Sequence, residues 1–207
     1  GNNNDNNDMV ERSVVDELFI LVQKPAFDVA SDAYKTLQLL LTRNKKHVQK
    51  YLTDNYDIFF NQVNKLIQSE NYVTQRQFLN LLSEILLEKE NRKSMFKYAD
   101  DKANLKIIMT LLKSKSNAIA HEAFHIFKIF VAKPRVNMVN DETGQITYIS
   151  YESLQIKIVL YKNCEKLIDF LGKFLNDKAK EDENFAQERK TVITYLEQLK
   201  QKDDPQK

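Results

Sequence analysis

The sequence predicts an all-α protein whose helices stack as repeated units, and three observations support this fold class. Only three glycines and three prolines occur among the 207 residues, which leaves few residues for the tight turns of an all-β fold. Apolar residues make up 43% of the chain and recur with helical spacing almost throughout. The same pattern of apolar positions also returns roughly every 45 residues, a period typical of helical repeats.

The repeat is clearest in three long helical segments, expected at residues 28–43, 72–90 and 117–132. Tyr34, Phe78 and Phe124 stand at matching positions of these segments. A short and a medium helix separate each long helix from the next, expected at residues 45–53, 54–68, 91–99 and 102–114. A period in the forties built of three helices predicts an armadillo/HEAT-like α-solenoid of three-helix repeats, whose units stack because none covers its apolar face alone.

The rest of the chain divides around this repeat. We expect an Asn-rich disordered tail at 1–8, helical repeats over 9–133 that start with a helix at 9–23, an inserted loop at 134–150, capping helices of the same domain within 151–201, and a tail at 202–207. The inserted loop contains a proline, a glycine and a polar cluster. The capping helices are expected at 152–176 and 182–201, the second with a narrow apolar stripe of Phe185, Val192, Leu196 and Leu199.

Composition argues against several classes of function. The net charge of +2 is too small for an electrostatically driven nucleic-acid binder, and the apolar runs are far shorter than the roughly 20 residues of a membrane span. The single cysteine, Cys164, cannot form an internal disulfide and fits a reducing, cytoplasmic compartment. The sequence has no phosphate-binding loop, dinucleotide fingerprint or nucleophile elbow, so we expect neither an enzyme nor a cofactor.

One motif points to a different chemistry. His121, Glu122 and His125 match the H-E-x-x-H pattern of zinc peptidases, in which two histidines one helical turn apart bind zinc. A third ligand is required, and neither Glu142 nor Glu152 has the expected helical context. The alternative is that these histidines lie at the edge of an ordinary core-forming helix, so a zinc metallohydrolase is the remote hypothesis and no metal is expected.

The remaining candidates are surface side chains. Four polar residues lie off the apolar stripe of the second long helix or just beyond its end: Arg76, Asn80, Lys89 and Arg92. They are candidates for a partner-binding concave wall, and the alternative is that they are ordinary solvated charges. Lys106 and Met109 share a face of one helix, and Lys162 lies on a helix expected nearby. A methionine beside lysines suits a pocket for an aromatic residue and a carboxylate.

Several segments resemble one known family, that of calcium-binding protein 39, also called mouse protein twenty-five. The matching segments are Phe27–Tyr34 (FDVASDAY), Leu41–Arg43 (LTR), Ser69–Gln77 (SENYVTQRQ), Asn104–Lys106 (NLK), Glu122–Pro134 (EAFHIFKIFVAKP) and Lys166–Leu171 (KLIDFL). The resemblance runs from about residue 27 to 200 with one interruption. It places His125 in a family string of a non-catalytic protein, which weakens the zinc hypothesis further.

The resemblance implies a scaffold that binds a sterile-20-related pseudokinase or a sterile-20-type kinase. The scaffold holds the kinase fold of its partner in the closed, active arrangement. It implies that Arg76 and Lys89 contact the kinase, while Lys106, Met109 and Lys162 bind a C-terminal Trp-Glu-Phe tail. Asn80 and Arg92 replace a basic and an aromatic residue of the family, so a generic helical-repeat adaptor with a different peptide partner stays open.

The resemblance also concerns the ends and the loop of the chain. The match begins partway through the family's length, and the loop at 134–150 is longer than the family's by about 16 residues. An apolar end exposed in this way is a candidate homodimer surface.

Overall fold

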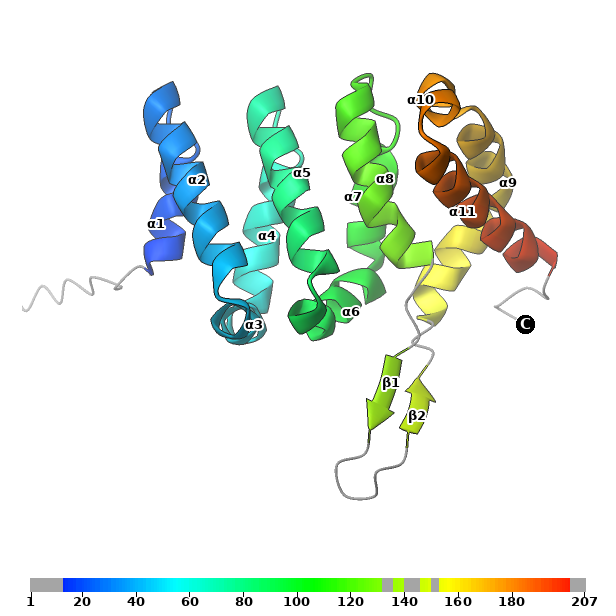
Figure 1. Cartoon of the computed structure of the whole chain (residues 1–207), viewed down its shortest axis with the longest axis horizontal. Coiled ribbons are helices and arrows are strands. Elements are labelled where there is room, and N and C mark those ends of the chain that lie inside the picture. The colour runs from blue at the N-terminus through cyan, green and yellow to red at the C-terminus, as the bar shows by residue number, and fades with distance from the viewer. Residues whose placement is uncertain (1–12, 132–135, 140–145, 150–152, 202–207) are drawn as a thin grey trace, which may run out of the picture.

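The computed structural model describes residues 13–131, 136–139, 146–149 and 153–201. Its helices lie in two layers (Figure 1). One layer places three long helices side by side: α2 (Phe27–Arg43), α5 (Tyr72–Leu87) and α8 (Asn117–Val131). The second layer lies behind the first and holds α1 (Val14–Leu21), α4 (Tyr56–Leu66) and α7 (Lys102–Leu111). This arrangement confirms the predicted all-α solenoid.

The remaining elements complete the repeats. The connections between the layers are α3 (Lys45–Asp54), the short 3₁₀ helix η1 (Lys89–Asn91) and α6 (Arg92–Asp100). The C-terminal end is formed by α9 (Leu154–Lys173), α10 (Asn176–Glu181) and α11 (Glu183–Gln201). None of the described helices is both long and apolar enough to cross a membrane.

Matching positions of the first two long helices contact each other. The rings of Tyr34 on α2 and Phe78 on α5 lie 5.7 Å apart in an edge-to-face arrangement. The Tyr34 hydroxyl also donates a hydrogen bond of 2.9 Å to the backbone carbonyl of Gln77. Aromatic pairs of this geometry stabilise a fold by about 0.5–1.5 kcal/mol beyond their buried area. The same residues that reveal the repeat in the sequence therefore join one repeat to the next.

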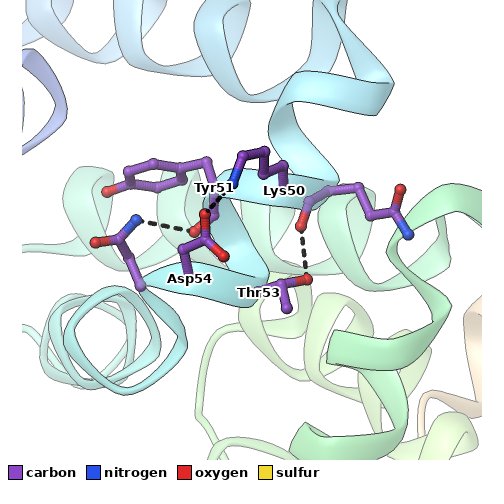
Figure 2. Close-up of polar contacts among 6 residues, drawn as sticks. Lys50, Tyr51, Thr53 and Asp54 are labelled. Carbon is purple, nitrogen blue, oxygen red and sulfur yellow. Dashed lines mark hydrogen bonds and ion pairs between the residues drawn. The ribbon is translucent and has the colours of Figure 1, made fainter.

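Side chains fix where the helices begin and end. The side-chain oxygen of Asn71 accepts from the backbone N–H groups of Val73 and Thr74, which caps the first turn of α5. The last turn of α3 is tied by two contacts, drawn in Figure 2. The Lys50 ammonium lies 2.7 Å from the Asp54 carboxylate, and the Thr53 hydroxyl donates to the backbone carbonyl of Gln49.

Burial at the C-terminal end follows the predicted stripe. Phe185, Val192, Leu196 and Leu199 are all buried, and α11 packs against α9. Cys164 lies in this interface, where its thiol donates to the backbone carbonyl of Leu196 at 3.5 Å. The thiol is therefore part of the core.

The structure differs from the sequence-based expectation in two helices. The helix expected at 72–90 ends at Leu87, because Glu88 adopts an extended backbone and its carboxylate accepts from the N–H of Lys89 to start η1. The helix expected at 152–176 ends at Lys173, and Leu175 takes a left-handed conformation with φ of 46° before the short α10. The left-handed conformation costs a non-glycine residue about 1 kcal/mol, and glycine is the usual residue there. Because a leucine occupies this position, the sequence gives no signal for the turn.

Within the predicted loop at 134–150, the described residues 136–139 and 146–149 form two strands. Strands β1 (Val136–Val139) and β2 (Ile146–Ile149) pair antiparallel, with Val136 opposite Ile149 and Val139 opposite Ile146. β-branched residues account for this pairing, since they favour extended backbone. The tails predicted at 1–8 and 202–207, and residues 9–12 of the first predicted helix, lie outside the described residues.

Candidate partner-binding surfaces

The first candidate surface lies on α5. Arg76 and Asn80 are both exposed and stand four residues apart, so their side chains lie on one face of the helix. The opposite face is anchored by Phe78, Leu81 and Leu82, each 0% exposed. The two polar side chains are therefore presented by a helix that its core contacts hold in place.

Two exposed aromatic residues lie at the N-terminal ends of α5 and α2, and the sequence pattern did not identify them as site residues. Tyr72, the first residue of α5, is 47% exposed and lies one helical turn before Arg76. Phe27, the first residue of α2, is 71% exposed. A cavity of about 370 Å³ lies between these helix starts, with Phe27 and Val73 among its lining residues. The signal in the sequence is an aromatic residue at the start of a long helix, outside the repeating stripe.

This combination has the chemistry of an interface. Arginine, tyrosine and other aromatic side chains are the residue types that most often dominate binding energy, because they bury a large area with few rotatable bonds. The N-terminal ends of α2 and α5 therefore form the candidate anchor surface, defined here by Phe27, Tyr72 and Arg76.

The other two wall residues lie at the opposite end of α5. Lys89 is in η1 and Arg92 is the first residue of α6, and both side chains are exposed. Leu87, where α5 ends, is about 16 Å along the helix axis from Arg76, given a rise of about 1.5 Å per residue. The structure thus groups Arg76 with Asn80 and places Lys89 and Arg92 beyond the far end of the same helix.

The predicted tail pocket combines α7 and α9, which pack against each other. Lys106 and Met109 are one turn apart on α7, and Lys162 lies on α9. Met109 is half-buried against the hydrophobic core, while both lysines are exposed. Neither lysine makes an ion pair with any residue that the structure describes. One side of the methionine thus remains open to an incoming side chain, next to a cation on its own helix.

The two histidines of the H-E-x-x-H motif lie at the edge of the core. The rings of His121 and His125 are 4.5 Å apart, and the His121 ring is 5.4 Å from Phe185 on α11. Burial, together with the neighbouring His125, lowers the pKa of His121 to about 4, and burial also lowers the pKa of His125. Both rings are therefore neutral at pH 7 and pack between α8 and the C-terminal helices.

This placement matches the structural alternative to a zinc site. Among the described residues, no group of three or more His, Cys, Asp or Glu side chains is arranged to hold a metal ion. Glu142 and Glu152, considered above as third ligands, lie outside the described residues.

Known proteins match most of the chain. A family model described as Mo25-like matches residues 6–141. The chain is 42% identical over 184 residues to a protein of Mus musculus named calcium-binding protein 39-like, covering 89% of this chain and 50% of that protein. It is 41% identical over 181 residues to a Mo25-like protein of Schizosaccharomyces pombe, covering 87% of this chain and 50% of that protein.

A third relative is named for a different process. The degreening-related gene dee76 protein of Auxenochlorella protothecoides is 39% identical over 191 residues, which is 92% of this chain and 54% of that protein. The chain spans about half the length of these curated relatives. The matches confirm the resemblance to the calcium-binding protein 39 family.

Proposed function

Because this chain belongs to the Mo25-like family, we propose that it is a non-catalytic scaffold that binds a protein kinase or pseudokinase and stabilises its active conformation. The carrying observation is the anchor surface, where Phe27, Tyr72 and Arg76 are exposed at the ends of two helices held by the core. A folded kinase lobe offers the large complementary surface that such anchors need. The single buried cysteine fits the reducing compartment, the cytoplasm, in which such signalling proteins act.

The proposed mechanism is a shift in the populations of the open and closed conformations of the kinase. A scaffold that binds the closed kinase more tightly than the open one raises the closed fraction by the difference in binding free energy. Shifting the ratio of closed to open kinase from 1:99 to 99:1 requires a difference of about 5.5 kcal/mol between the binding free energies of the two conformations. Interface anchors contribute about 2 kcal/mol or more each, so a few anchors such as Arg76 and Phe27 suffice if they contact only the closed kinase.

A second contact is a C-terminal Trp-Glu-Phe tail at Lys106, Met109 and Lys162. A thioether contacts an aromatic ring favourably by about 0.3–1.5 kcal/mol, which suits Met109 to the tryptophan or the phenylalanine. The peptide's glutamate and terminal carboxylate are anions, and the two lysines carry no competing ion pair with the described residues. The tail thus tethers the partner while the anchor surface contacts its folded lobe.

The tail contact is tested by titrating the chain into a peptide ending in Trp-Glu-Phe. The chain contains no tryptophan, so the peptide's own fluorescence reports binding. We expect saturable binding that weakens about tenfold for Met109→Ala and for Lys106→Glu. Lys115→Glu makes the same charge change in the turn after α7 and should bind normally. Equal affinity for all three variants would refute the pocket.

An adaptor for a different peptide partner is the second candidate. Asn80 and Arg92 favour this second function. They stand at positions where the resemblance implies a basic residue and an aromatic residue, respectively. Such an adaptor would bind a tail peptide without changing kinase activity, whereas the scaffold must raise it. Measuring kinase activity beside peptide affinity separates the two functions.

A further inference from the structure

A second surface lies at the corner where α2 ends and α3 begins. An open cavity of about 740 Å³ is lined there by residues from both helices and by Glu90 of η1. This volume falls in the roughly 300–1,000 Å³ range of sites that bind small ligands or single side chains. Phe27 and Arg43 stand at opposite ends of α2, about 24 Å apart at the usual rise. The corner is therefore separate from the anchor surface.

The cavity has an apolar wall. Leu39 and Leu40 line it, and they are 57% and 47% exposed. Two adjacent leucines with this exposure form a surface on which another apolar side chain can be buried. The wall thus favours a ligand with an aliphatic group.

The rim of the cavity is positively charged. Arg43 and Lys46 line it, and neither makes an ion pair with any residue that the structure describes. The third cation, Lys45, is neutralised because its ammonium lies 2.7 Å from the Glu88 carboxylate. Glu90 is the single acidic residue of the described lining. Two unpaired cations therefore face a single carboxylate, and the rim attracts an anion.

From this combination we propose that the corner binds an acidic peptide segment of a partner protein, with a leucine-sized side chain in the cavity and carboxylates at Arg43 and Lys46. Two unpaired cations are few beside the roughly 6–10 phosphate contacts typical of a DNA-binding protein. A flat bilayer surface would leave the hollow beside Leu39 and Leu40 unfilled. The proposal goes beyond the kinase contact, because it uses none of the anchor or tail-pocket residues.

The experiment uses the full chain and a fluorescein-labelled peptide, Glu-Asp-Leu-Leu-Glu-Asp-Leu-Glu, followed by fluorescence anisotropy. We expect saturable binding that weakens about tenfold for Arg43→Glu and for Leu40→Ser. Lys35→Glu is the matched control, because Lys35 is exposed on the same helix and lies outside the lining. Peptides with Gln and Asn for the acids, or Ser for the leucines, should also bind about tenfold more weakly.

Three results would overturn the proposal. One is that the acidic peptide binds the Arg43→Glu and Lys35→Glu variants with equal affinity. Another is that the unchanged chain binds the neutral peptide as tightly as the acidic one. The third is binding to phosphatidylserine vesicles without binding to the peptide. Circular dichroism identifies a variant that fails to fold, and Arg43→Gln, which removes the charge without reversing it, then provides the same comparison.

Discussion

The packing between repeats predicts that two leucines of one helix differ sharply in their contribution to stability. Leu82 and Leu87 both lie on α5, but Leu82 is 0% exposed and Leu87 is 58% exposed. Both replacements are leucine to alanine in the same helix, so the difference between them reports mainly the difference in burial. Leu82→Ala removes a fully buried side chain and leaves a cavity, which costs about 2–5 kcal/mol. Leu87→Ala should stay within about 0.5 kcal/mol.

Urea unfolding followed by circular dichroism at 222 nm measures both variants. With a denaturant slope of about 2–3 kcal/mol/M, Leu82→Ala should lower the urea midpoint by about 1–2 M. The loss is a large fraction of the roughly 5–15 kcal/mol that stabilises a typical domain. If both variants lowered the urea midpoint equally, Leu82 would not be buried and α5 would not be the central helix of the stack.

Three further outcomes are expected. The pKa of His121 is lowered to about 4 in the folded chain, so the unfolded chain binds more protons between about pH 4 and 6.5. Stability should therefore fall as the pH is lowered from 7 to 5, and His121→Gln should reduce that fall; an unchanged slope in urea midpoints would contradict the burial of this ring. Tyr34→Phe removes a hydrogen bond to a carbonyl of α5 and should cost about 0.5–1.5 kcal/mol, whereas no change in the urea midpoint would exclude this inter-repeat bond. Burial raises the pKa of the Cys164 thiol, so a disulfide reagent should label it far more slowly in the folded chain than in urea, and equal labelling rates would place the thiol at the surface.

The periodicity of the sequence was sufficient to predict the stack of repeats. Tyr34, Phe78 and Phe124 occupy matching positions, and the first two contact each other in the structure. Such prediction succeeds because every repeat must bury the same face, which imposes the same spacing of apolar residues. The stripe of α11 was predictable for the same reason.

Breaks in the helices were harder to predict. Glu88 and Leu175 interrupt or end helices without glycine or proline, since a side-chain acceptor acts at Glu88 and the packing of Leu175 against the core favours its strained backbone. Tertiary contacts decide such positions, and a single sequence does not display them.

The candidate site was predictable only in part. Helical spacing put Arg76 and Asn80 off the apolar stripe, and both are exposed in the structure, but it gave no distance between them and the pair Lys89 and Arg92. Phe27 and Tyr72 were missed because periodicity identifies the apolar residues that are buried, and an exposed aromatic side chain looks the same in the sequence. Their exposure becomes visible only when the neighbouring helices are in place.

The function we propose for this chain is to activate a kinase by binding it. The most direct measurement is the activity of a sterile-20-type kinase titrated with the chain and with its Arg76→Ala variant. We predict that activity rises to a plateau with the chain, and that Arg76→Ala needs about tenfold more protein for half the effect. Kinase activity that stays constant across the titration would contradict the claim.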